Sequence, residues 1–241
     1  MHKNSLGFQN PLRLLTQRTE EILPPGGFGA ILARAGVGKT SFLIQISLDY
    51  LLRGKNVLHI SLNDPVEKVC IWYEEVFRNI SANWSRSQQK MARDKMFQHR
   101  FIMTFTKEGF TVPVLEERLT DITQQNVFSP QILMMDGFPF HARSDIHLYG
   151  LKKLLKKNSL CSWFTVRTHR HEAPGPNGMP PSLGKASDLF EVAIELKPSG
   201  SEIHINPLKG CEHGPGGGEL LLDPASLMIK NKASSTIYYL N

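Results

Sequence analysis

The stretch that decides the fold of this chain is residues 28–44, which read FGAILARAGVGKTSFLI. An apolar run, a loop of small residues and a second apolar run follow one another, and this order predicts a strand, a tight loop and a helix. Residues 33–40 fit the Walker A pattern of a phosphate-binding loop, although Ala33 stands where the strict pattern has Gly. Alanine is acceptable there if it ends the strand with φ below zero.

Each residue type in this loop suits a bound phosphate. Gly36 and Gly38 allow the tight turn that points successive backbone N–H groups at phosphate oxygens. Lys39 can reach the β- and γ-phosphates, and the Thr40 hydroxyl can ligate Mg²⁺. The helix that begins at Lys39 adds its positive N-terminal dipole beneath the anion. We therefore expect ATP and Mg²⁺ as cofactors, with the nucleotide held by Ala35, Gly36, Val37, Gly38, Lys39, Thr40 and Ser41.

A carboxylate for the metal is expected after a short apolar strand, residues 131–136, which read QILMMD. Asp136 ends this strand as the Asp of a Walker B element does, and α/β sheets bind ligands at the carboxyl ends of their strands. Thr40 and Asp136 are therefore the predicted metal ligands. The alternative is that Asp136 only caps a helix or forms a turn with Gly137.

A group that activates water is expected at the end of the strand predicted for residues 56–62, where Asn63, Asp64 and Pro65 follow. If this strand ends at the same edge as Asp136, Asp64 can orient or deprotonate the attacking water. Lys39 and Asp64 are thus the candidate catalytic residues. The alternative is an ordinary strand-to-helix turn in which Asp64 caps the next helix.

The rest of the core alternates between helical and strand patterns, which is typical of a parallel sheet covered on both faces. Strands are expected at residues 28–33, 56–62, 100–106, 131–136 and 160–168, and helices at 11–25, 40–53, 65–79, 85–98, 112–124 and 144–157.

The C-terminal part has a different character. Residues 169–187 hold four prolines and three glycines, so we expect a long flexible loop without regular structure. A β-hairpin is predicted from residues 189–197 and 202–208, and closing strands from 219–230 and 235–240. We expect one domain over residues 1–241, divided into a helical lead-in (1–25), a phosphate-loop core (28–168), the loop (169–187) and C-terminal strands (188–241).

Composition limits the function classes. With 241 residues, 41% of them hydrophobic, the chain can form one α/β domain with a full core. The net charge of +6 leaves nucleic-acid binding open, but the lysines of residues 151–157 surround leucines at helical spacing, which is typical of a solvated helix face. No apolar run approaches the ~18 residues that span a membrane. Three widely spaced cysteines and the lack of a secretory signal predict a cytoplasmic protein.

The motifs and their order resemble the RecA/KaiC-like branch of P-loop ATPases over roughly residues 25–210. The resemblance implies an α/β fold, with a mostly parallel sheet flanked by helices and a C-terminal antiparallel β extension, in a single-domain protein of bacterial or archaeal type. It also implies that Asp64 activates water, with Asn63 in place of one acidic partner, and that Lys209 faces the nucleotide of a neighbouring subunit. A polar sensor is implied at residues 168–170, and residues 169–187 take the place of the DNA-contacting loops of recombinases.

The leading functional hypothesis is a slow, Mg²⁺-dependent ATPase that works in a homo-oligomer or with a partner protein. One alternative is a nucleotide-gated regulatory or scaffold protein with vestigial hydrolysis, which the neutral Asn63 favours. Another is a small-molecule P-loop kinase, for which Arg167 and Arg170 could hold the transferred phosphate.

Overall fold

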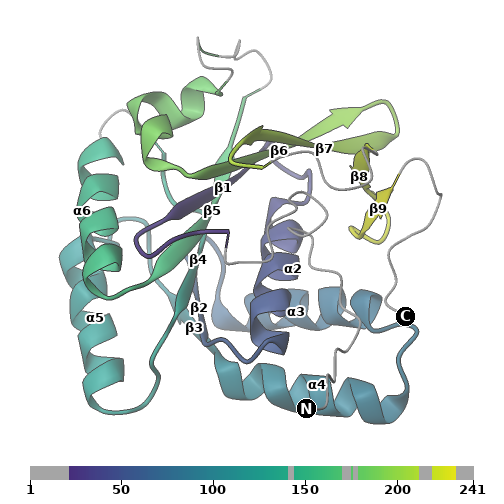
Figure 1. Cartoon of the computed structure of the whole chain (residues 1–241), viewed down its shortest axis with the longest axis horizontal. Coiled ribbons are helices and arrows are strands. Elements are labelled where there is room, and N and C mark those ends of the chain that lie inside the picture. The colour runs from purple at the N-terminus through teal and green to yellow at the C-terminus, as the bar shows by residue number, and fades with distance from the viewer. Residues whose placement is uncertain (1–21, 141–143, 170–174, 176–178, 212–218, 232–241) are drawn as a thin grey trace.

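Nine strands of the described chain form one sheet, in the order β3-β2-β4-β5-β1-β6-β7-β8-β9 (Figure 1). The computed structural model describes residues 22–140, 144–169, 175, 179–211 and 219–231. Strands β1 to β6 pair in parallel, whereas β7, β8 and β9 continue the sheet in antiparallel pairs. The strand bounds are β1 Phe28–Ala33, β2 Val57–Ser61, β3 Arg100–Thr104, β4 Ile132–Asp136, β5 Cys161–Arg167, β6 Val192–Ser199, β7 Glu202–Lys209, β8 Leu220–Leu222 and β9 Ile229–Asn231.

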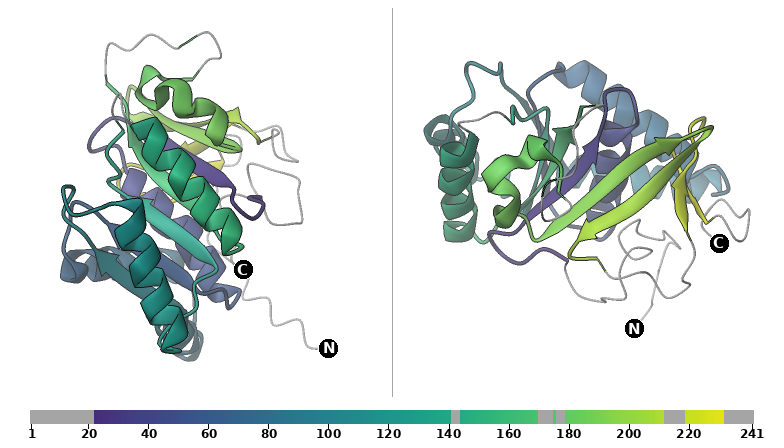
Figure 2. Two further views of the ribbon diagram at one scale, coloured as in Figure 1. Left: turned by 90° about the vertical axis from the view of Figure 1, so that its left-hand side faces the viewer. Right: turned by 90° about the horizontal axis from the view of Figure 1, so that it is seen from above.

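Helices cover both faces of this sheet, as Figure 1 and Figure 2 show. One face packs against α2 (Lys39–Leu52), α3 (Val66–Ile80) and α4 (Arg86–His99), and this layer holds the larger apolar core. The other face packs against α5 (Val112–Gln124) and α6 (Ser144–Lys157), which enclose a second core. The sheet therefore separates two cores, as expected for a parallel sheet with helices on both sides.

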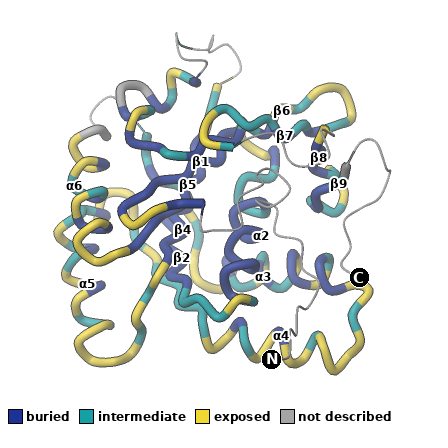
Figure 3. The backbone as a smooth tube through the Cα atoms, viewed as in Figure 1, coloured by how far each residue is buried: buried dark blue, intermediate teal, exposed yellow. Residues whose placement is uncertain are grey.

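The central strands are apolar along their whole length because both of their faces are covered. Every residue of β1, β2 and β4 is buried, and Figure 3 shows these strands at the buried centre of the molecule. Gly29 in β1 meets a specific steric demand, since a Cβ atom there would clash with the ring of Trp163 on the neighbouring strand β5.

The predicted fold class is confirmed, and every helix and strand predicted between residues 28 and 168 is present, with bounds that shift by at most two residues. The predicted hairpin corresponds to β6 and β7, and the closing strands correspond in part to β8 and β9. The predicted helix over residues 11–25 falls mostly outside the described residues, and its described end, residues 22–25, forms bends and a turn. The strand predicted at residues 235–240 also lies outside the described residues.

The expectation of a loop without regular structure over residues 169–187 is wrong for its second half. Pro181–Leu189 forms the 3-10 helix η1, which packs against α6. Leu183 and Ala186 are buried in the second core, and they anchor this segment in spite of its prolines. Residues 170–174 and 176–178 lie outside the described part of the chain. Within that part, no helix is long and apolar enough to cross a membrane.

The carboxyl ends of four parallel strands lie side by side at one edge of the sheet. Ala33 at the end of β1 is in register with Arg167 of β5, and Ser61 of β2 is in register with Asp136 of β4. The loop that joins β1 to α2 begins at this edge, so the fold brings all of the strand-end candidates close to it.

Candidate phosphate-binding site

The loop of residues 34–38 has the backbone geometry that a bound phosphate needs. Gly36 and Gly38 have φ values of +76° and +103°, a region that residues with a side chain rarely adopt. Gly38 is also the N-cap of α2, and no side chain caps this helix. The first N–H groups of α2 therefore remain available to an anion at the positive end of the helix dipole.

The antiparallel extension packs against this loop. A Cβ atom at Gly38 would lie 3.1 Å from Leu222 Cδ2 and 3.2 Å from Leu227 Cδ2, both in the β8–β9 segment. Gln45 of α2 donates a hydrogen bond to the Leu227 carbonyl oxygen (2.7 Å), and Asn79 of α3 donates one to the Ser226 carbonyl oxygen (3.0 Å). The C-terminal hairpin is thus fixed beside the start of α2.

Lys39 folds back over the loop. Its Nζ donates hydrogen bonds to the carbonyl oxygens of Ala33 (3.0 Å) and Arg34 (2.8 Å). Burial lowers the pKa of Lys39 below its ordinary value, the charge of Asp136 opposes this change, and the charge of Arg167 adds to it. A phosphate oxygen would offer this ammonium group a charged acceptor in place of two neutral ones.

Asp136 is buried and bound by two hydroxyl groups. Thr40 Oγ1 donates to Asp136 Oδ2 (2.9 Å), and Thr165 Oγ1 donates to Asp136 Oδ1 (2.6 Å). Burial raises the pKa of Asp136, and the hydrogen bonds from Thr165 and Thr40 partly offset this change. The two predicted metal ligands are therefore in contact, although they lie 96 positions apart in the chain.

The donor set of this pair suits Mg²⁺. The ion prefers oxygen ligands, keeps several waters, and in nucleotide sites takes one or two protein ligands beside the phosphates. A hydroxyl and a carboxylate at the same point fit this requirement. No group of three or more His, Cys, Asp or Glu side chains with metal-binding geometry occurs among the described residues, so a metal cage made by the protein alone is absent from that part of the chain.

Thr165 was not found from the sequence. It lies on β5 directly beside Asp136, accepts a hydrogen bond from the Gly137 N–H (3.0 Å), and donates to the carboxylate. The available signal was a polar residue near the end of an otherwise apolar strand, in residues 161–167. Only the parallel pairing of β4 with β5 turns that signal into a contact.

Asp64 lies near the site but does not cap α3. Pro65 is the N-cap of that helix, without a side-chain hydrogen bond, so the capping alternative does not describe Asp64. The Asp64 carboxylate instead pairs with Lys68 Nζ at 2.6 Å. Ser61 fixes the Asp64 backbone, since its Oγ accepts from the Asp64 N–H (3.1 Å) and donates to the Asp64 carbonyl oxygen (2.9 Å). The charge of Asp64 contributes to the raised pKa of Asp136, so the two carboxylates share one electrostatic environment.

Asn63 packs over the residue that follows Asp136. Gly137 has a φ of +80°, and a Cβ atom there would clash with the Asn63 side chain. Asn63, Asp64 and Asp136 therefore converge at the ends of β2 and β4.

Lys209 does not join these residues within one chain. It ends β7, which runs antiparallel to β6, and it is in register with Ala193 near the beginning of β6. Lys209 thus lies towards the opposite edge of the sheet, where its Nζ donates to the Ser187 carbonyl oxygen (3.4 Å). Contact with a neighbouring subunit's nucleotide stays a prediction.

The predicted sensor residues lie just beyond β5. The Thr168 N–H donates to the Ala33 carbonyl oxygen (3.0 Å), which continues the pairing with the loop strand. His169 is described and Arg170 is not. The strand itself ends at Arg167, which is the β5 residue in register with Ala33.

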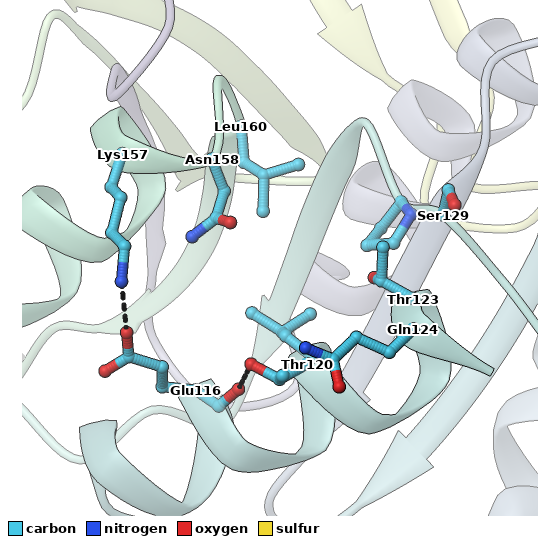
Figure 4. A pocket seen from close by; sticks show the side chains of 10 residues that line it. Glu116, Thr120, Thr123, Gln124, Ser129, Lys157, Asn158 and Leu160 are labelled. Carbon is cyan, nitrogen blue, oxygen red and sulfur yellow. Dashed lines mark hydrogen bonds and ion pairs between the residues drawn. The ribbon is translucent and has the colours of Figure 1, made fainter. Parts of the chain in front are cut away.

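Two cavities lie at the other edge of the sheet, away from the phosphate loop. One of about 550 Å³ lies between α5 and α6, and in Figure 4 the Lys157–Glu116 ion pair (2.9 Å) is at its margin. The second, of about 990 Å³, is lined by residues 22–25 and by residues that precede β4 and β5. Neither contains a residue of the phosphate loop, so neither is the candidate site.

Comparison with known proteins bears on the fold. No protein-family model and no curated protein match the chain. Among solved structures, the ATPase domain of a RecA-like replicative helicase superposes with a TM-score of 0.62 at 16% sequence identity, over 86% of this chain and 85% of that one. The match therefore extends over most of the sheet and the helices that cover it. The chain has the RecA-like P-loop ATPase fold.

Proposed function

We propose that this chain binds ATP with Mg²⁺ at the loop of residues 33–40 and hydrolyses it slowly. One observation carries the proposal: Lys39, Thr40 and Asp136 converge at the carboxyl edge of the sheet, beside the uncapped start of α2. A cation, a hydroxyl, a carboxylate and free backbone N–H groups are the parts that binding of a metal–triphosphate requires.

Lys39 and the loop backbone would bind the β- and γ-phosphates. The Lys39 ammonium group would exchange the carbonyl oxygens of Ala33 and Arg34 for phosphate oxygens, and the N–H groups at the start of α2 would hold the β-phosphate. These donors are fixed before the reaction, so they stabilise the charge that develops on the phosphate oxygens without reorganisation.

Thr40 and Asp136 would hold Mg²⁺, which supplies neutralisation of the phosphate charge when bound. The Thr40 hydroxyl would turn from the Asp136 carboxylate towards the metal. Thr165 would continue to donate to the other carboxylate oxygen and so keep Asp136 in its orientation.

Asp64 is the proposed base that orients or deprotonates the attacking water. Its backbone is fixed by Ser61, and its carboxylate is close enough to Asp136 to influence its pKa. The ion pair with Lys68 and the neutral neighbour Asn63 both reduce the negative charge available for this role, which supports a slow reaction. The proposal includes an oligomeric assembly, in which Lys209 would face the site of a neighbouring subunit.

A second candidate is a nucleotide-gated regulatory or scaffold protein in which binding persists and hydrolysis is vestigial. The same Asp64–Lys68 ion pair favours it, because a carboxylate held by a lysine is poorly placed to accept a proton from water. The contacts of Leu222 and Leu227 with Gly38 also favour it, because they link the phosphate loop to the C-terminal hairpin.

The decisive experiment is calorimetric titration of the purified chain with ATP, with and without Mg²⁺, followed by a phosphate-release assay. The wild-type chain is expected to bind ATP more tightly with Mg²⁺, and Lys39→Ala to lose at least about tenfold in affinity, since a charged hydrogen bond is worth about 1.5–3 kcal/mol. Lys153→Ala is the matched control, because Lys153 is exposed on α6, on the far side of the sheet.

Equal ATP affinity in wild type and Lys39→Ala would contradict the phosphate-loop assignment. Measurable phosphate release by wild type, lost in Lys39→Ala and retained in Lys153→Ala, would identify the chain as an ATPase. Tight binding without phosphate release would favour the regulatory candidate.

A further inference from the structure

Arg167 is a second cation at the phosphate loop. It is the last residue of β5 and is in register with Ala33, the last residue of β1. The Ala33 carbonyl oxygen accepts hydrogen bonds from Lys39 Nζ and from the Thr168 N–H. The residue that follows Ala33 begins the loop, so the backbone of Arg167 lies beside the beginning of the phosphate loop.

Strand alternation gives the side of the sheet on which Arg167 lies. Val166 is buried in the core under α5 and α6, whereas Thr165 faces Asp136 on the side of α2. Side chains alternate along a strand, so Arg167 lies on the same side as Thr165. This is the side on which α2 and the phosphate loop cover the sheet, so Arg167 shares the face that carries Asp136.

The Arg167 side chain is exposed and, within the described residues, has neither an acidic partner nor a hydrogen-bond acceptor. Other cations around the site are paired: Lys68 with Asp64, and Lys39 with two carbonyl oxygens. The positive charge of Arg167 is felt at Lys39, where it lowers the pKa of the ammonium group. Two cations that repel each other at one loop create a demand for an anion between them.

We propose that Arg167 contacts the terminal phosphate of the nucleotide and so distinguishes a triphosphate from a diphosphate within a single chain. The inference rests on the proposed function. The β-phosphate belongs at the start of α2, so the terminal phosphate lies further towards the ends of β4 and β5, where Arg167 stands. A guanidinium group presents a fork of donors that matches phosphate oxygens in pairs.

This role differs from the one predicted for Lys209. Lys209 lies towards the opposite edge of the sheet and could reach a nucleotide only on another subunit. Arg167 supplies a cation from the same chain as the phosphate loop. Recognition of the terminal phosphate would then need no neighbouring subunit.

The test compares two nucleotides on the full chain by calorimetry: ADP, and the non-hydrolysable β,γ-imido analogue of ATP, both with Mg²⁺. Arg167→Ala is expected to lose about 10- to 100-fold in affinity for the analogue, and less than about threefold for ADP. Arg167→Lys is expected to lie between wild type and Arg167→Ala, because it keeps the charge but not the fork. Arg118→Ala is the control for the loss of one charge, since Arg118 is exposed on α5.

The ADP measurement separates a phosphate contact from a structural role. An equal loss for both nucleotides would overturn the inference, because it would mean that Arg167 supports the loop as a whole. An unchanged affinity for the analogue would also overturn it, and either result would leave the proposed function intact. Failure of the wild-type chain to bind either nucleotide would overturn both.

Discussion

The Thr40 hydroxyl donates a hydrogen bond to the Asp136 carboxylate, with 2.9 Å between Oγ1 and Oδ2. Thr40 is on the first turn of α2 and Asp136 is the last residue of β4, so this contact joins the phosphate loop to a strand two positions away in the sheet. Because both atoms are oxygens that Mg²⁺ accepts as ligands, the hydrogen bond marks the point at which the metal would bind.

Asp136→Asn is expected to separate stability from metal binding. Burial raises the pKa of Asp136, so the native state holds the proton more tightly than the unfolded chain. The free energy of unfolding therefore decreases as pH rises from the unfolded pKa, near 3.9, through the higher native value. The neutral Asn avoids this cost, so the variant without nucleotide should be at least as stable as wild type at pH 7.5. It should also lose about 10- to 100-fold in Mg²⁺ affinity.

Urea unfolding between pH 4 and 8 checks the first part, and nucleotide titrations at several Mg²⁺ concentrations check the second. Thr165→Val is the control, because it removes one hydrogen bond to Asp136 and keeps the carboxylate. A large loss of stability in Asp136→Asn at pH 7.5 would mean that the charged carboxylate stabilises the fold, contrary to this argument.

Asp64→Asn is expected to leave ATP affinity nearly unchanged and to lower turnover by roughly 10²–10⁴-fold, the usual contribution of a general base. The matched control is Lys68→Ala, which breaks the same ion pair but keeps the carboxylate. Lys68 is about half exposed, and an exposed ion pair is worth at most about 1 kcal/mol, so this variant should stay within about fivefold of wild-type turnover. Equal turnover losses in the two variants would show that the ion pair, and not the base, is needed.

Gly38→Ala is expected to weaken both the fold and nucleotide binding. The φ of +103° costs a residue with a side chain about 1–3 kcal/mol, and the new methyl group would press on Leu222 and Leu227. Gly36→Ala is the comparison, because it has a positive φ of +76° but no atom within 4 Å of the added Cβ. Urea unfolding should show a larger loss for Gly38→Ala, and adding Leu222→Ala should recover part of the difference. No recovery would argue against the packing of the hairpin on the loop.

His59 is expected to make the fold sensitive to acid. It is fully buried on β2, and burial, together with the charge of Arg100, lowers its pKa to about 3. Between that value and the ordinary 6.5, the unfolded chain binds a proton that the native chain does not, so stability decreases as pH falls below about 6.5. The expected slope from this residue is about 1.4 kcal/mol per pH unit.

His59→Gln should remove this slope, and the Tyr73–Ser47 hydrogen bond (2.6 Å) should preserve most of the local packing. Urea unfolding at pH 7.5, 6.0 and 5.0 measures the difference between variant and wild type. His147→Gln, on the exposed face of α6, is the control and should retain the wild-type acid sensitivity. A parallel pH dependence in wild type and His59→Gln would assign the acid sensitivity to other residues.

The sequence was sufficient for the elements of the core and for the phosphate loop. The apolar run of β1, the glycines that follow it and the apolar start of α2 are local signals, because each depends on residues a few positions apart. Asp136 could be chosen for the same reason, since it ends a continuous apolar strand. Gly36 and Gly38 were identified correctly as positions that need backbone freedom, and their positive φ values agree.

Tertiary structure alone decided which strand ends meet. The order β2-β4-β5-β1 brings together strands that are distant in the chain, and this order depends on how whole helices and strands pack. Only then do Thr165 and Arg167 become neighbours of Asp136 and Ala33, and only the antiparallel course of β7 takes Lys209 away from them. The periodicity of one segment carries no information about its register with a distant one, because register is set by the side chains of both strands and the helices that cover them.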